Sequence, residues 1–182
     1  MTTSADAAVF VLDTTCLCHF ALADRLDVLR ELLLGTECWT TAAVIEELRA
    51  GVPTHPALSG AIDVDWISVA RLDHLPEIAC FLKWAQRIGS GERDIGEATV
   101  LATAELKDGI AIIEDRSAVR VARKHGAVVH GTVWLFARAC RQAKLTVVAA
   151  ENLIEALRVT GMRLPCTGAE FPSYARRHGL LG

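Results

Sequence analysis

Long apolar runs are missing from this sequence of 182 residues. No run approaches the roughly 18 apolar residues that a membrane-spanning helix needs, which argues against an integral membrane protein. The first six residues contain neither a basic region nor a long apolar stretch, so we expect no signal peptide and a cytoplasmic location. Because 52% of the residues are hydrophobic, the composition argues against disorder and predicts a well-packed core.

Positive charge is not in excess either. The formal net charge is −3, which does not indicate a protein coated in positive charge for nucleic acid, although it is compatible with a local basic patch. The six histidines show no ligand spacing. Cys16 and Cys18 form a Cys-x-Cys pair without a second pair, so we expect free thiols rather than a zinc site. No glycine-rich phosphate loop of the Walker or dinucleotide type is present.

What the sequence does contain is short, wholly apolar segments that end in acidic residues. Residues 9–12 run into Asp13, and residues 110–113 run into Glu114 and Asp115. Uninterrupted β-prone apolar residues are typical of strands that are buried on both faces. Carboxylates therefore follow directly on buried strands, where an uncompensated charge is unfavourable.

Helical segments separate these strands. We expect helices at residues 16–23, 26–34, 42–50, 57–62, 73–88, 98–106, 117–125, 133–144 and 149–159. Further strands are expected at residues 37–40, 66–69 and 127–130. Such alternation predicts an α/β fold in three layers, with a central parallel sheet flanked by helices. We find no repeat or composition break, so we expect one domain over residues 1–182, with a core at about 9–144 and a helical tail at about 145–182. The helix at 73–88 is predicted to bury the apolar face Leu75, Ile78, Ala79, Leu82 and Ala85.

Four acidic residues lie where this fold brings side chains together. They are Asp13, Glu47, Glu97 and Asp115. Strand ends and the first turns of the following helices share one edge of a parallel sheet, so we expect these carboxylates to converge. Uncompensated repulsion would keep at least one of them protonated. Carboxylate oxygens are ligands that Mg²⁺ or Mn²⁺ prefers, so a metal site for phosphodiester hydrolysis is the hypothesis.

Each of these acids also has a simpler interpretation. Asp13 and Asp115 could cap helices, and the position of Glu97 at a helix N-terminus is favourable by itself. Glu47 could be solvated together with its neighbour Glu46. Three further residues are candidates for supporting roles just outside the ligand set: Thr14, Thr15 and Asp94. Asp94 could also be a ligand itself, in place of Glu97 or beside it. Glu114 is expected to be exposed or to lie just outside the ligand set.

Four motifs follow one another along the chain. They are Val-Leu-Asp13-Thr-Thr-x-Leu, Val-Ile-Glu46-Glu47-Leu-Arg-Ala-Gly, Gly96-Glu97-Ala98-x-x-Leu-Ala-Thr-Ala, and Ile-Ile-Glu114-Asp115-Arg leading to Val-x-Gly131-Thr132. In this order they resemble the PIN-domain family, and within it the VapC-like ribonuclease toxins and their close relatives. The resemblance spans about residues 9–144. Any one motif is weak evidence, but four in order are fairly specific.

The resemblance has consequences for fold, activity and partners. It implies a PIN-like (Rossmann-like) fold and a metal-dependent endoribonuclease that uses Mg²⁺ or Mn²⁺. It implies that the catalytic residues and metal ligands are Asp13, Glu47, Glu97 and Asp115. VapC-type proteins act as the toxin of a type II toxin–antitoxin pair, so an antitoxin partner and a homodimer are expected as well.

A basic helix follows the fourth acid. Its charged residues are Arg116, Arg120, Arg123 and Lys124, and their spacing lets several share one face. We expect them to contact the RNA backbone, although a solvated basic face is the simpler alternative. Two rival functions stay open: a catalytically silent PIN-like module that binds RNA or protein, and a phosphatase-like metalloenzyme. The intact set of acids argues against the first, and the lack of Asp-x-Asp after the first strand argues against the second.

Overall fold

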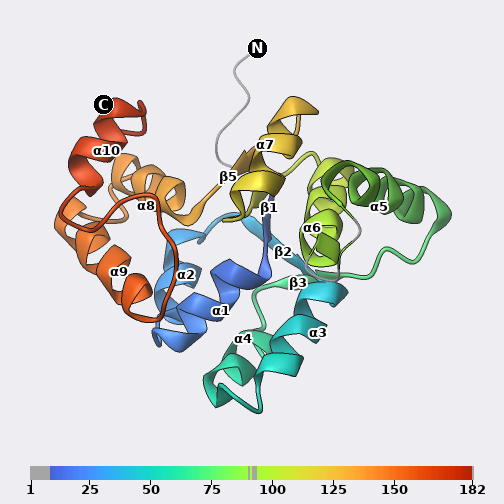
Figure 1. The fold of residues 1–182 in the computed structure, drawn as a ribbon. Coiled ribbons are helices and arrows are strands. Elements are labelled where there is room, and N and C mark those ends of the chain that lie inside the picture. Colours follow the sequence, from blue (N-terminus) through green and yellow to red (C-terminus); the bar gives the residue numbers. More distant parts are fainter. Residues whose placement is uncertain (1–8, 90, 92–93, 182) are drawn as a thin grey trace.

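Within the described part of the chain, five short parallel strands form the sheet at the centre of the molecule (Figure 1). The computed structural model describes residues 9–89, 91 and 94–181; the first six residues, on which the signal-peptide expectation depends, lie outside this part. The strands are β1 (Val9–Leu12), β2 (Glu37–Thr41), β3 (Ser68–Ala70), β4 (Ile110–Ile112) and β5 (Val129–His130). Their order is β3-β2-β1-β4-β5, which places β1 at the centre and β3 at an edge.

The central strand is apolar at every position because helices cover both of its faces. Phe10, Val11 and Leu12 are fully buried. Leu12 lies opposite Ile112 in the β1–β4 pair, and the N–H of Asp13 donates to the carbonyl oxygen of Ile112 at 3.2 Å. The two strands therefore end at the same level, which puts Asp13 beside the residues that follow β4.

Helices lie on both sides of the sheet (Figure 1). They are α1 (Thr14–Leu22), α2 (Leu26–Leu32), α3 (Ala42–Gly51), the short 3₁₀ helix η1 (Pro56–Leu58), α4 (Ser59–Ile62), α5 (Leu75–Ile88), α6 (Asp94–Leu106), α7 (Arg116–Lys124), α8 (Thr132–Arg141), α9 (Val147–Val159) and α10 (Phe171–Arg177). One side carries α5, α6 and α7, and the other carries α1, α2, α8 and α9. This arrangement confirms the predicted three-layer α/β fold.

The order of the strands reverses between β1 and β4. From β1 the chain continues through β2 to β3 at one edge, and it then returns to place β4 on the other side of β1. In open α/β sheets, ligands bind outside the carboxyl ends of the strands at such a switch point. Asp13 and the pair Glu114–Asp115 follow the two strands that flank it.

The predicted buried face of α5 is wrong. Leu75 is 83% exposed and Leu82 is 51% exposed, whereas Cys80 and Trp84 are buried. The indole N–H of Trp84 donates to Glu105 of α6 at 2.8 Å. Burial of this large ring and its hydrogen bond to α6 determine how α5 is rotated, and the periodicity of the apolar residues does not report either effect.

The chain after α8 packs back onto the helices of one side. Helix α9 contacts α8 and α1, and α10 contacts α9. Phe171 and Ala175 of α10 are fully buried. Because these side chains are anchored, the segment that leads from α9 to α10 is held against the rest of the molecule.

No helix in the described part of the chain is both long and apolar enough to cross a membrane. The cysteines are free thiols, and four of the six are buried: Cys16, Cys38, Cys80 and Cys166.

Candidate active site

Asp13 is a buried carboxylate at the carboxyl end of β1, with only 4% of its surface exposed. Its Oδ1 accepts the N–H of Cys16 at 2.8 Å, so it caps α1. The pKa of Asp13 is raised to about 8, mainly by burial; the negative charges of Glu114 and Glu97 also raise it, whereas hydrogen bonds from the backbone amides of Cys16 and Glu114 lower it. The hydrogen bond to the N–H of Cys16 explains the conformation of the Asp13 side chain. The neighbouring negative charges oppose ionisation of Asp13, so a cation nearby would stabilise its charged form.

Two acids follow β4 and differ in their surroundings. Asp115 is exposed, and its Oδ1 accepts the N–H of Ala118 at 2.8 Å, which caps α7. Glu114 is half-buried, and its Oε1 accepts the N–H of Thr132 at the start of α8. Burial raises the pKa of Glu114, while the hydrogen bonds from Thr132 lower it. A Cβ at Gly131 would lie 3.2 Å from this carboxylate, so the glycine leaves room for it.

Glu97 interacts through its charge with several of the other acids. It is half-buried in the first turn of α6, and among the described residues its buried Oε2 has no hydrogen-bond partner. The pKa of Glu97 is raised to about 7, mainly by burial and in addition by the charges of Asp115, Asp94 and Glu47. The charge of Glu97 also acts on Asp13. Glu97 is therefore electrostatically coupled to all the other predicted ligands, and one of its oxygens is free to accept a ligand.

Glu47 reaches the site from α3. The hydroxyl of Thr14 donates to its Oε2, and its carboxylate lies against Gly96 at the start of α6. A Cβ at Gly96 would come within 2.5 Å of Oε1 of Glu47, so only glycine accommodates the side chain in this position. The neighbouring Glu46 is exposed and pairs with Arg49 at 2.5 Å. Of these two glutamates, only Glu47 is oriented towards the other acids.

Asp94 has a local role at the start of α6. Its Oδ2 accepts the N–H of Gly91 at 3.2 Å and lies near Gly89. Its charge still reaches Glu97, but its carboxylate is hydrogen-bonded to the turn that precedes the helix. The geometry therefore favours Glu97 over Asp94 as a ligand.

A cavity of about 640 Å³ opens over this end of the sheet. Its lining residues are Thr15, His19, Glu97, Glu114, Asp115, Arg116, Gly161 and Arg163. Neither Asp13 nor Glu47 lines this cavity. Asp13 is buried beneath the surface at the end of β1. The cavity thus joins two of the four predicted ligands with Glu114, which the sequence placed outside the ligand set.

The expected cluster of four carboxylates is looser than the sequence suggests. In residues 9–89, 91 and 94–181, no three Asp, Glu, His or Cys side chains converge closely enough to hold a metal ion as they stand. Asp13 and Asp115 each direct an oxygen to a backbone amide, and Glu47 accepts from Thr14. These hydrogen bonds keep like charges apart.

Two residues in the cavity carry no signal in the sequence. Nδ1 of His19 lies 2.7 Å from Oγ1 of Thr160, and the Thr160 hydroxyl donates to the carbonyl oxygen of Leu157 at 2.7 Å. His19 Nδ1–H is therefore the donor to Thr160. Burial lowers the pKa of His19, which favours its neutral form. Arg163 comes from the segment between α9 and α10, far from every motif. The role of Glu114 could have been inferred from the Gly131-Thr132 pair in the sequence, because the backbone N–H of Thr132 donates a hydrogen bond to the Glu114 carboxylate.

The predicted basic residues of α7 do not all lie together. Arg116, Arg120 and Arg123 line a second cavity of about 480 Å³ beside the first. Lys124 lines neither cavity. Three of the four candidate cations of α7 therefore line this cavity beside the acids.

The fold and the site together define an α/β protein with a doubly wound parallel sheet and a group of carboxylates at its switch point. Over residues 9–169 the sequence matches the family described as "DUF3368: PIN domain". The chain belongs to the PIN-domain family, which confirms the resemblance drawn from the four motifs.

The chain was also compared with curated proteins and with solved structures. The search of curated proteins returns no match. Among solved structures, the chain is similar to a chain in the crystal structure of VapBC2 from Rickettsia felis bound to a DNA fragment from their promoter. The two are 10% identical with a TM-score of 0.49, and the match covers 68% of this chain and 98% of that chain.

Proposed function

We propose that this protein is a metal-dependent endoribonuclease that hydrolyses RNA phosphodiester bonds. The observation that supports this most strongly is the unpartnered, buried Oε2 of Glu97, which lies among the charges of the other acids. A buried carboxylate oxygen without a hydrogen bond is unfavourable, and a cation would both ligate it and offset the repulsion.

The residues present suit a hard divalent cation. Oxygen ligands from several carboxylates are what Mg²⁺ and Mn²⁺ prefer. In this proposal Asp13, Glu97 and Asp115 hold the metal, and Glu47 completes the set. When bound, such a cation lowers the pKa of an attacking water and stabilises charge on the leaving oxygen.

The neighbouring side chains orient the ligands and the substrate. The Thr14 hydroxyl holds Glu47 through a hydrogen bond. The Thr132 amide does the same for Glu114, which we propose as a supporting residue that stabilises the site from the β4 side. Arg116 lines the same cavity as Glu97 and Asp115, where its guanidinium can bind a phosphate of the RNA.

A cleavage assay tests the function. Purified protein is incubated with structured and single-stranded RNA in Mn²⁺ or in EDTA, beside the variants Asp13→Ala, Asp115→Ala and the matched control Glu46→Ala. We expect cleavage only with metal, and a loss of at least ~10²-fold in the first two variants, because each removes a charge that positions the metal. Glu46→Ala should cleave normally, since Glu46 is exposed and pairs with Arg49.

Cleavage that persists in EDTA or survives both active-site substitutions would contradict this mechanism. Binding of RNA without any cleavage, by wild-type protein with Mn²⁺ present, would favour the alternative of a catalytically silent PIN-like module.

The substitution Gly96→Ala isolates the role of Glu47. The new Cβ would lie 2.5 Å from Oε1 of Glu47 and would force this flexible side chain to turn away. Alanine is itself favourable inside a helix, by roughly 0.5–1 kcal/mol. We therefore expect an unchanged or higher thermal midpoint with cleavage reduced at least ~10-fold, provided that Glu47 supports the metal.

Gly60→Ala in α4 is the matched control for this variant, because its Cβ would make an ordinary contact of 3.5 Å with Leu26. Full cleavage activity in Gly96→Ala would remove Glu47 from the proposed ligand set.

On the basis of the motif resemblance to VapC-like toxins, we further propose a biological role. The protein is the toxin of a type II toxin–antitoxin pair, acts in the cytoplasm and forms a homodimer. A gene directly upstream whose small product binds the protein and inhibits cleavage would support the toxin role. Sedimentation of the purified protein measures the homodimer.

A further inference from the structure

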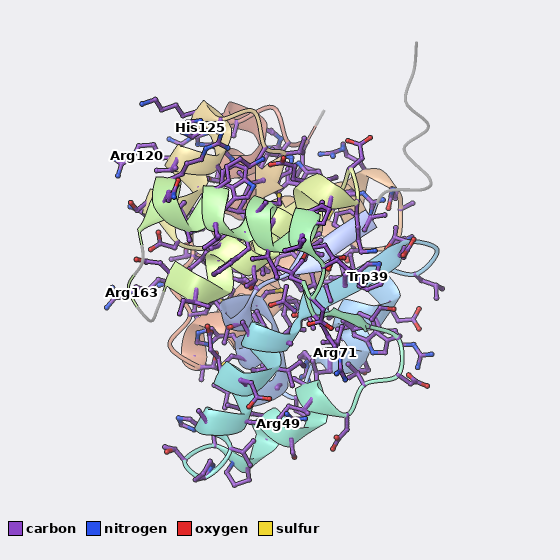
Figure 2. All side chains as sticks on the ribbon, turned by 90° about the vertical axis from the view of Figure 1, so that its right-hand side faces the viewer. Trp39, Arg49, Arg71, Arg120, His125 and Arg163 are labelled. Carbon is purple, nitrogen blue, oxygen red and sulfur yellow. The ribbon has the colours of Figure 1, made fainter. Side chains whose placement is uncertain are left out.

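A groove lined by arginines adjoins the acidic cavity. We call it the arginine groove, and its lining residues are Ile113, Glu114, Arg116, Val119, Arg120, Arg123, Gly131, Arg163, Pro165 and Tyr174. Glu114, Arg116 and Arg163 also line the acidic cavity, so the two cavities adjoin each other. Figure 2 shows Arg120 of α7 and Arg163 of the C-terminal segment projecting from the same side of the molecule.

The cations of this groove lack acidic partners. Within the described part of the chain, Arg116, Arg120 and Arg163 form no ion pair with a carboxylate. Glu114 is the one acid in the lining, and its Oε1 already accepts the N–H of Thr132. Arg123 donates to the carbonyl oxygen of Val129 at 3.3 Å, which fixes its side chain along the groove. Guanidinium groups gathered in this way repel one another unless an anion binds between them.

Tyr174 adds an aromatic ring to the groove. The residue is half-buried, and its ring lies 4.3 Å from that of His178, measured between centroids. Burial raises the pKa of its hydroxyl, as do the charges of Cys166 and Glu114, whereas the positive charges of Arg116 and Arg123 lower it. Tyr174 thus shares the lining of the groove with the arginines.

The wall that carries Arg163 and Tyr174 is anchored. Phe171 and Ala175 of α10 are fully buried, and Cys166 is 5% exposed. The guanidinium of Arg141 on α8 donates to the carbonyl oxygen of Leu180, which ties the end of the chain to the helical layer. A wall held in place before the ligand arrives loses little entropy on binding.

We propose that the C-terminal segment forms half of a binding groove for single-stranded RNA, in which Arg163 binds a backbone phosphate and Tyr174 stacks on a base next to the scissile bond. Positive grooves that combine cations with aromatic rings are how proteins hold single strands. The proposal rests on the proposed ribonuclease function, and it gives the bound strand a path from the acidic cavity over α7 and α10.

An acidic protein segment is the competing occupant. The shared wall with the acidic cavity favours RNA, because a strand with its scissile phosphate near Glu97 and Asp115 would place the adjoining phosphates at Arg116 and Arg163. A carboxylate-rich peptide would gain from the arginines but has no reason to approach the acids.

Binding without cleavage tests the groove separately from the chemistry. A fluorescein-labelled single-stranded RNA of 12 nucleotides is titrated in EDTA at several salt concentrations. We expect Arg163→Ala to weaken binding at least ~5-fold at low salt and to reduce the slope of log K against log salt by about 0.7. Tyr174→Ala should also weaken binding at least ~5-fold, whereas Tyr174→Phe, which keeps the ring, should bind like wild type.

Arg176→Ala is the matched control, since Arg176 is exposed on α10 beside Tyr174, carries the same charge as Arg163 and does not line the groove. An equal effect of Arg163→Ala and Arg176→Ala, or no effect of either Arg163→Ala or Tyr174→Ala, would overturn the proposal. So would an Arg163→Ala variant that loses binding of poly-glutamate but keeps binding of RNA. If wild type cleaves RNA in Mn²⁺ and these variants bind and cleave normally, the groove is refuted while the ribonuclease stands.

Discussion

Replacing Glu97 by glutamine is expected to lower metal-dependent RNA cleavage by at least ~10²-fold. Glu97 is affected by the charges of Asp115, Asp94 and Glu47, and its Oε2 has no hydrogen-bond partner among the described residues. The amide keeps the size of the side chain but removes the charge that would attract the metal. Cleavage rates and the affinity for Mn²⁺, measured by calorimetry, should therefore fall together while the fold is retained.

Asp94→Asn is the matched comparison for this variant. Asp94 lies in the same helical turn, but its Oδ2 accepts the N–H of Gly91. An asparagine can still accept this hydrogen bond, so we expect less than a ~5-fold loss of cleavage. Losses of similar size in the two variants, or a larger loss in Asp94→Asn, would show that Glu97 is not the main ligand from α6.

Raising the pH should weaken the metal-free protein. The pKa of Asp13 is 3.8 in its ordinary state and about 8 in the fold, chiefly because of burial. The folded state thus holds this proton more tightly than the unfolded chain does. The contribution of Asp13 to the free energy of unfolding should therefore be largest at pH 4 and below, fall as the pH rises towards 8, and level off above it. Each pKa unit corresponds to about 1.4 kcal/mol, so the loss amounts to several kcal/mol.

Urea unfolding in EDTA between pH 5 and 9 measures this dependence. Asp13→Asn should flatten it and should be more stable than wild type at pH 8, because asparagine also caps helices well and carries no charge. Glu97, whose pKa rises to about 7, contributes in the same direction and leaves a residual slope. Saturating Mn²⁺ should stabilise wild type above pH 7 far more than the variant. If the free energy of unfolding of the wild-type protein rises from pH 5 to 8 in EDTA, the raised pKa of Asp13 in the folded state is contradicted.

Much of the fold could be predicted because its strands are buried on both faces. A parallel strand between two helical layers has to be apolar at each position, as in β1 and β4, so the run of apolar residues and the acid that ends it are visible directly. Helix caps such as Thr41, which accepts the N–H of Val44 at 3.3 Å, are equally local. The rotation of α5 was not predictable in the same way, because it depends on the hydrogen bond between Trp84 and Glu105 of another helix.

The sequence by itself determined the family, the parallel α/β fold and the position of Asp13, Glu97 and Asp115 at strand ends and a first helical turn. These features depend on local patterns of apolar residues and on the order of the four motifs in the sequence. Only the tertiary structure decided that Glu97 is the acid coupled to all the others, and that Arg163 and Tyr174 lie beside the arginines of α7. Burial, electrostatic coupling and contacts between distant segments arise from packing in three dimensions, and no local pattern of residues encodes them.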